Sequence, residues 1–522
     1  MPTIWNETFE IDMPLCAGRN IAEQSIKDLQ HSMNVGHFTA LDLTKCYLAY
    51  IQKLNPRLSA VIELNPDALA IADRLDEERR YGIVRGPLHG IPFLVKDNIA
   101  TKDSMNTTAG SSMLIGANVP RDAHVVELLR QKGAVLLGHA NMSEWSSMRA
   151  FHYSEGYSTR GGQSRNPYNL SKNPGGSSSG SAIAVSANMC AFSLGTETKS
   201  RVIFPADRNG IVGLRPTRGR VSCDGVIPVS RNFDTVGTFG RTVADAAAAL
   251  DGISDGNRSL TNHLTDHRDL SDVTKIGSIG ESVPDYGCCD WDFQSLRGYP
   301  ERSQHTVVKV DFFNDLRRYL SSLVTNPCGI HGVQEVVAYN RNIASGGGFP
   351  WTHPAWPSGQ DSFEKSMASG GTEDDAYRDA LSHIQRMSQD NGLDRAFEYD
   401  DERDFDALLV PVQAGGGAVM QLAAQAGYPM ITIPLDINPF DGIPYGTALI
   451  VKPHRDDKLI RLGSALERVL LIENRARQPP LFLNVEAENL IFIKDGTDDD
   501  DSEGDYHSDE NDTYDEYGQL MS

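Results

Sequence analysis

Residues 174–192, PGGSSSGSAIAVSANMCAF, contain the strongest local signal in the chain. Two adjacent glycines and three serines come directly before an alanine-rich segment. This order predicts a tight loop that opens onto a helix from about Ser181 to Phe192. Hydroxyl groups in such a loop lie near the positive end of the helix dipole. The loop is therefore the first candidate for a ligand-binding or reactive site.

Two well-known loop types share features with this stretch, and neither fits. A phosphate-binding loop would end in Gly-Lys-Ser or Gly-Lys-Thr, or would carry GxGxxG after a strand, and residues 174–181 have neither pattern. Gly176 to Gly180 match GxSxG with Ser178 at the centre. The α/β-hydrolase turn, however, needs a strand just before that serine, and here SRNPYNLSKNP precedes it.

Helix and strand patterns alternate around this loop, which is typical of α/β layers. Thr39 and Asp42 have capping-box spacing, and Pro56 is expected to stop the helix that they begin. Short apolar runs after glycine-rich turns predict buried strands, one of which carries Lys96 at its end. The predicted elements are helices at Thr39–Leu54 and Val125–Lys132 and strands at Ile91–Val95, at Ala134–Leu137 and within 405–453.

The remainder of the chain divides into a body and a tail. Residues 255–300 and 343–375 are polar and weakly periodic, which predicts loops around a variable second lobe at about 255–400. We expect a body at 1–493 and an acidic tail at 494–522. Like charges in the tail repel and little apolar surface can be buried there, so disorder is expected.

Composition restricts the function classes. The 522 residues are 40% hydrophobic and carry a net charge of -22, of which 495–522 contribute twelve acidic residues, leaving -10 elsewhere. This balance argues against nucleic-acid binding, which requires a basic face. No apolar run is long enough to span a bilayer, and the N-terminus does not resemble a signal peptide, so a cytoplasmic location is expected. A small-molecule substrate is the remaining expectation, and the sequence leaves the oligomeric state open.

Cysteine and histidine spacing gives no sign of a metal site or a cofactor. The seven cysteines lack CxxC spacing, and free buried thiols are the simpler interpretation. His89 and His139 stand near the informative stretches without any ligand spacing around them. We therefore expect neither a metal nor another cofactor.

Lys96 is the second candidate, because a lysine at the end of an apolar strand loses hydration and its pKa falls. Such a lysine can act as a general base on a serine hydroxyl. Taken singly, a strand-end lysine and a Ser-Gly loop are each more often structural. Their combination strengthens the functional interpretation.

Four ordered blocks resemble the amidase signature family, and its fungal-type amidases in particular. They are GPLHGIPFLVKDN at 86–98, GHANMSEW at 138–145, RNPYNLSKNPGGSSSGSA at 165–182 and GIVGLRPTRGRVS at 210–222. The resemblance implies an α/β fold with a large mixed central sheet covered by helices. It also implies hydrolysis of carboxamide carbon–nitrogen bonds by a Ser, cis-Ser, Lys triad.

Carried over residue by residue, this resemblance assigns Lys96 as the base and Ser177 as the cis-serine that relays a proton. The family's nucleophile lies 24 residues further on, within a pattern close to LGTDTGGSIRIPA. The aligned stretch here is LGTETKSRVIFPA at 194–206, so the nucleophile position holds Arg201, and Lys199 and Ser200 replace two glycines. A guanidinium cannot attack a carbonyl, because it stays protonated and has no available lone pair. Substrate contacts are expected from Thr198, Lys199 and Arg201.

Three hypotheses remain open at this stage. The first is an amidase-like hydrolase that uses Ser200 as a substitute nucleophile with Ser177 and Lys96. The second is a catalytically inactive amidase scaffold that binds a small molecule or a protein partner. The third makes Arg201 a clamp for a carboxylate or phosphate.

Overall fold

The computed structural model describes residues 12–256, 259–265, 276–278, 300–342, 348–400, 403–413, 417–473, 477–480 and 482. The acidic tail expected at 494–522 lies outside these ranges, as does most of the loop expected at 255–300. The boundary of the variable lobe stays a prediction.

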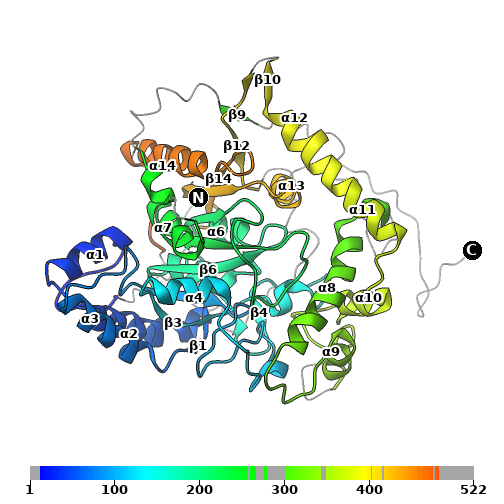
Figure 1. Ribbon diagram of the computed structural model, residues 1–522, viewed down its shortest axis with the longest axis horizontal. Coiled ribbons are helices and arrows are strands. Elements are labelled where there is room, and N and C mark those ends of the chain that lie inside the picture. Colours follow the sequence, from blue (N-terminus) through cyan, green and yellow to red (C-terminus); the bar gives the residue numbers. More distant parts are fainter. Residues whose placement is uncertain are drawn as a thin grey trace, which may run out of the picture.

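A ten-stranded mixed sheet forms the centre of the molecule, as the sequence predicted (Figure 1). Its strand order is β1-β3-β2-β6-β8-β7-β13-β14-β12-β9. Two small sheets pair β4 (Tyr157–Ser158) with β5 (Gly162–Gln163) and β10 (Glu398–Asp400) with β11 (Arg403–Asp404). The central strands are β1 (Val61–Leu64), β2 (Pro92–Lys96), β3 (Val135–Ala140), β6 (Phe192–Glu197), β7 (Val212–Arg215), β8 (Thr235–Gly240), β9 (Ile276–Ser278), β12 (Ala407–Pro411), β13 (Met430–Ile437) and β14 (Pro444–Ile450).

Three parallel strands at the heart of this sheet prepare the site. β2 pairs with β3 on one side and with β6 on the other, in parallel register with Val95 opposite Leu194. All residues of the three strands are buried. Parallel strands present their carboxyl ends at one edge, so Lys96 at the end of β2 and Thr196 near the end of β6 come together there.

Helices cover both faces of the sheet. The Ser193 hydroxyl on β6 donates to Ser181 O of α5, whereas the Thr238 hydroxyl on β8 donates to Ala246 O of α7. Ser193 pairs with Phe239, the residue after Thr238, and successive strand residues point to opposite faces, so α5 and α7 lie on opposite sides. The helices named so far and their neighbours are α1 (Ile26–Asn34), α2 (Ala40–Leu58), α3 (Ala68–Arg80), α4 (His124–Gln131), α5 (Ser179–Ser186), α6 (Ile203–Arg208), α7 (Val243–Ile253) and α14 (Asp456–Ile472).

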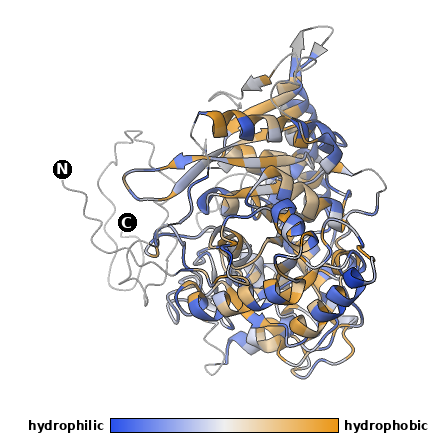
Figure 2. Ribbon diagram, turned by 90° about the vertical axis from the view of Figure 1, so that its left-hand side faces the viewer, coloured by the Kyte–Doolittle hydropathy of each residue, from blue (hydrophilic) through white to orange (hydrophobic). Residues whose placement is uncertain are grey.

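A second helical group packs beside the sheet, where Figure 1 shows α8 to α11 in green and yellow on one side of the molecule. Apolar residues of these helices, including Phe312, Val336 and Phe363, form a buried cluster of their own with Trp145. In Figure 2 hydrophobic residues run along the central strands, while the outer helices alternate between hydrophobic and hydrophilic. The elements here are α8 (Gln304–Ser321), α9 (Val333–Asn340), α10 (Asp361–Ser369), α11 (Asp375–Gln385), α12 (Asp394–Phe397) and α13 (Ala418–Ala426), the short helices η1 (Ser112–Leu114), η2 (Glu144–Ser147), η3 (Leu260–His263) and η6 (Pro300–Arg302), and the π-helical η8 (Arg386–Leu393).

The sequence predicted the starts of helices better than their ends. Thr39 caps α2 in a capping box with Asp42, as expected. Pro56 does not stop that helix, which continues to Leu58. Proline fits helical backbone angles and removes only one hydrogen bond in the last turn, so the helix ends instead where Ser59 turns left-handed at φ 47°.

Two other boundaries were wrong. The helix expected from Ser181 to Phe192 spans Ser179–Ser186, because Asn188 adopts φ 58° and turns the chain into β6. The loop expected at 343–375 contains α10, which buries Phe363 against the second cluster. Tertiary packing of one apolar face stabilises that helix despite its weak periodicity.

The described cysteines are unpaired: Cys16, Cys46, Cys190, Cys223 and Cys328 are free thiols. No group of three or more His, Cys, Asp or Glu side chains is arranged to hold a metal ion within the described ranges. None of the helices described here has both the length and the apolar character needed to cross a membrane.

Candidate functional site

Lys96 and Ser177, two of the residues singled out from the sequence, lie in direct contact. Lys96 Nζ donates to Ser177 Oγ at 2.7 Å and to Thr196 Oγ1 at 2.8 Å. Lys96 and Ser177 are fully buried, and Thr196 is 8% exposed. No carboxylate of the described residues lies within hydrogen-bonding distance of Lys96 Nζ. Among these residues its hydrogen bonds go only to hydroxyl oxygens.

Burial lowers the pKa of Lys96 well below its usual value, and the nearby Arg201 cation lowers it further. Asp234, Glu155 and Glu197 act in the opposite direction, with smaller effect. Removing an ammonium group from water disfavours its charged form, and a neighbouring cation does the same. The site thus contains a lysine whose charged form is disfavoured by its surroundings.

The loop that presents Ser177 is fitted closely against its surroundings. The Gly176–Ser177 peptide bond is cis, and Ser177 O accepts a hydrogen bond from Ser143 N at 3.1 Å. A Cβ atom at Gly176 would stand 1.9 Å from Glu155 Oε2. A side chain at position 176 would displace Glu155 and Ser143, which accounts for the second of the paired glycines in the sequence.

Arg201 reaches the same region and forms an ion pair there. Its Nη1 lies 2.7 Å from Glu155 Oε1 and 3.3 Å from Ser147 Oγ. The other Glu155 oxygen, Oε2, accepts from Ser143 Oγ at 2.7 Å. The side chains of Arg201 and Glu155 are 25% and 10% exposed, so the pair borders solvent.

The two ends of the loop around Arg201 are firmly anchored. Glu197 at the end of β6 accepts hydrogen bonds from the backbone N–H groups of Val202 and of Ile203, the latter at 3.2 Å. It also faces Arg215 Nε at 3.7 Å, and both side chains are fully excluded from solvent. Glu197 therefore holds the backbone that directly follows Arg201.

The other residues predicted from this loop fall in different environments. The Thr198 hydroxyl donates to Asp234 Oδ1 at 2.6 Å, an interaction that holds the loop rather than presenting the hydroxyl to a ligand. Burial raises the pKa of Asp234 to about 6. Ser200 is partly exposed, and its carbonyl accepts from Phe204 N at 3.0 Å. Among the described residues its hydroxyl group has no hydrogen-bond partner.

Sequence reasoning missed the acid of this site. Glu155 lies in FHYSEGYS at 151–158, outside the four stretches that resemble the family. Only the fold brings it beside Gly176 and Arg201. Thr196 and Asn98 were also missed, although Asn98 Nδ2 donates to Thr196 Oγ1 at 3.1 Å behind the lysine. Their positions directly after β2 and near the end of β6 were the available signal.

His139 lies on the adjacent strand and interacts with structural partners. Its Nδ1 is 2.9 Å from Asp97 Oδ1, and its Nε2 is 2.9 Å from the Thr101 hydroxyl. Both Asp97 and His139 are completely buried. This arrangement agrees with the expectation that His139 has a structural role.

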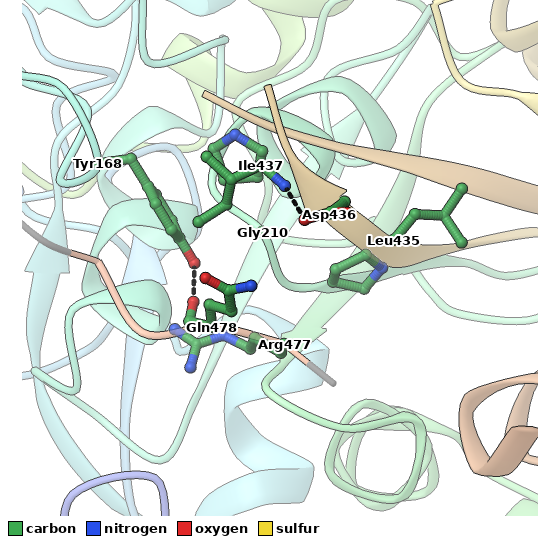
Figure 3. A pocket seen from close by; sticks show the side chains of 9 residues that line it. Tyr168, Gly210, Leu435, Asp436, Ile437, Arg477 and Gln478 are labelled. Atoms are coloured by element: carbon green, nitrogen blue, oxygen red, sulfur yellow. Dashed lines mark hydrogen bonds between the residues drawn. The ribbon is translucent and has the colours of Figure 1, made fainter. Parts of the chain in front are cut away.

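A separate small pocket lies beside β13 (Figure 3). The Tyr168 hydroxyl donates to the Gln478 carbonyl there, at 2.5 Å, and Arg477 lines the same pocket. None of the site residues predicted from the sequence lines it.

Comparisons with known proteins place this geometry in a family. Residues 42–416 match the family model described as Amidase. A Schizosaccharomyces pombe protein named "Putative amidase" is 41% identical over 93% of this chain and 91% of its own length. An Arabidopsis thaliana protein named "Probable amidase" is 35% identical over 89% of this chain and 92% of its own length.

Solved structures give the same result. The peptide amidase PAM in complex with the competitive inhibitor chymostatin superposes with a TM-score of 0.77 and 35% identity, covering 88% of this chain and 99% of its own. An amidase family protein from Bacillus anthracis has a TM-score of 0.73 and 27% identity, over 88% of this chain and 92% of its own. With a match over most of its length and the expected central sheet, this chain belongs to the amidase family of carbon–nitrogen bond hydrolases.

Proposed function

We propose that this protein binds a small acyl compound at the Lys96–Ser177 pair and does not cleave carboxamides by its family's route. One observation carries the proposal: Arg201 stands at the sequence position where the family resemblance expects the attacking serine, and its guanidinium is ion-paired with Glu155. The other two residues expected in the site, Lys96 and Ser177, are in direct contact, with Nζ and Oγ 2.7 Å apart.

The size of the expected loss supports binding without turnover. Removing a nucleophile from a catalytic unit lowers the rate by about a millionfold, which corresponds to roughly 8 kcal/mol of barrier. Lys199 and Ser200 also add side chains where two glycines would leave the backbone free to approach a developing oxyanion. Both changes act against catalysis.

Hydrolysis through Ser200 is the second candidate. Its hydroxyl group is partly exposed, has no partner among the described residues, and stands one position from the family's nucleophile. Lys96, whose pKa is lowered, would supply the base. Two points argue against hydrolysis through Ser200. No hydrogen bond joins Ser200 to Ser177 within the described residues, and catalytic groups tolerate a misplacement of only about 1 Å.

A fluorophosphonate probe, which labels activated serines, separates the two candidates. We expect no labelling of the wild-type chain and none of Ser200→Ala. The triple variant Lys199→Gly, Ser200→Gly, Arg201→Ser restores the family's loop and is expected to be labelled at position 201, with Arg201→Ser alone as the intermediate case. Labelling of wild type that disappears in Ser200→Ala would contradict the proposal and establish hydrolysis through Ser200.

A further inference from the structure

We infer that the ligand of this site carries an ionised carboxylate, which the Arg201 guanidinium binds together with the Ser177 hydroxyl group. The inference rests on the proposed binding function and names the chemical class of the ligand. It concerns the acid form of an acyl compound rather than the neutral carboxamide.

The Arg201 guanidinium has N–H groups that the described residues do not engage. Among the described residues, Glu155 and Ser147 engage Nη1 alone, and the N–H groups on Nε and Nη2 have no hydrogen-bond partner. The side chain is 25% exposed, so these donors are reachable from solvent. The edge formed by Nε and Nη2 presents two parallel N–H groups, an arrangement that matches the two oxygens of one carboxylate.

Ser177 supplies another donor. Its oxygen accepts a hydrogen bond from Lys96 Nζ, and the hydroxyl proton has no acceptor in the described part of the chain. The side chain is fully buried, where a donor without an acceptor is unfavourable by about 1–3 kcal/mol. An acceptor from a ligand would remove that penalty.

A carboxylate suits this set of donors better than an amide does. Both of its oxygens accept hydrogen bonds, whereas a primary carboxamide has one accepting oxygen and an NH2 group that only donates. Next to Arg201 and Ser177, the NH2 group would face further donors. The site therefore favours the acid over the matching amide through hydrogen bonding as well as charge.

The wider surroundings add positive charge. Burial and the cations Lys309, Lys365 and Lys199 lower the pKa of His305 to about 3, which shows that lysines from α8, α10 and the Arg201 loop gather around that ring. Glu155 is the acid in direct contact with Arg201, and Asp374 lies near Lys309. These lysines would attract an anionic ligand, in a manner that weakens as salt screens the charges.

The test measures binding of matched acid and amide pairs, namely acetate with acetamide, benzoate with benzamide, and N-acetylphenylalanine with its amide. Isothermal titration calorimetry at neutral pH and low salt is the readout. We expect at least one acid to bind about 10- to 100-fold more tightly than its amide, the range that charged hydrogen bonds give. Equal binding of acid and amide, or no binding of any acid at millimolar concentration, would overturn the inference.

Three variants test whether Arg201 is responsible for the preference for acid over amide. Arg201→Gln is expected to abolish it, while Glu155→Gln removes the competing carboxylate and should tighten binding of the acid. Arg130→Gln is the matched control, because Arg130 is 27% exposed and pairs with Asp103 at the same 2.7 Å, and it should leave the preference unchanged. A preference that persists in Arg201→Gln would also overturn the inference.

Failure of the inference is distinguishable from failure of the proposed function. A wild-type chain that is labelled by the serine probe and hydrolyses the amides contradicts the proposed function, whatever the acids do. Amides that bind as tightly as acids without being hydrolysed leave the proposed function standing and reject only the carboxylate. Inorganic phosphate serves as a third probe: tighter binding of phosphate than of any acid would also reject the carboxylate.

Discussion

The two halves of the site differ in how firmly the fold holds them. Lys96 and Ser177 are fully buried, lie at the end of a central strand and in a glycine-dependent loop, and touch at 2.7 Å. Residues 199–201 are partly exposed, and they read Lys-Ser-Arg where the family resemblance leads us to expect Gly-Gly-Ser. A half that is packed on all sides tolerates few side chains, while a half that borders solvent can accept different side chains without loss of the fold.

The anchors of the exposed half explain this tolerance. Glu197 and Arg215 stay buried beneath the loop, and Glu197 holds the backbone of Val202 and Ile203. Lys199, Ser200 and Arg201 between these anchors are partly exposed, so large cations fit where glycines are expected. Arg201 then finds Glu155 as an ionic partner.

The largest expected effect is a gain of catalysis that depends on the buried half. We expect the triple variant Lys199→Gly, Ser200→Gly, Arg201→Ser to hydrolyse amides. Adding Lys96→Met to this variant should lower its rate by about 10³-fold or more, because a serine without its base is a weak nucleophile. Release of ammonia from primary amides, measured by a coupled assay, checks it. Turnover unaffected by Lys96→Met would show that the buried half takes no part.

Removing Arg215 from the buried pair with Glu197 should lower the free energy of unfolding more than removing Arg201 from its pair with Glu155. Arg215→Met leaves the buried Glu197 carboxylate without its cation, and we expect a loss of about 3–5 kcal/mol in the free energy of unfolding. Urea denaturation followed by circular dichroism measures it. A loss below about 1 kcal/mol would mean that the loop does not depend on this pair.

Lys96 should make stability depend on pH. Its folded-state pKa lies below the usual 10.5, so the folded chain binds fewer protons in the window between the two values. Stability relative to Lys96→Met therefore rises as pH increases from the folded pKa toward 10.5, by at most about 1.4 kcal/mol per pH unit. Urea unfolding of both proteins at several pH values tests this, and a difference that is constant across pH would contradict a lowered pKa.

The smallest effect is expected at the exposed pair. Arg201→Gln removes an ion pair whose partners are 25% and 10% exposed, and we expect a change of less than about 1 kcal/mol in the free energy of unfolding. The shift of the thermal midpoint measures it, with Arg130→Gln as the matched control. A loss comparable to that of Arg215→Met would show that both halves are equally structural.

The sequence predicted those parts of the fold that depend on local pattern. The capping box at Thr39, the strand that ends at Lys96 and the loop from Pro174 that opens onto a helix follow from residue spacing and composition, and the structure contains all three, with α5 already beginning at Ser179. The ends of helices did not follow, because Ser59 and Asn188 adopt left-handed angles that the surrounding packing imposes. Phe363 on α10 is buried by contacts with α8, which weak local periodicity does not reveal.

By itself, the sequence was enough to predict an amidase-type sheet with a lysine at the end of one strand and a serine loop, and it predicts that Arg201 stands where the family's attacking serine is expected. Only the tertiary structure decided that Glu155 neutralises part of that arginine and that Lys96 meets hydroxyl groups rather than carboxylates. The physical reason is that covalent spacing fixes which groups a strand or loop presents, whereas charge pairing across 46 residues of chain depends on how separate segments pack.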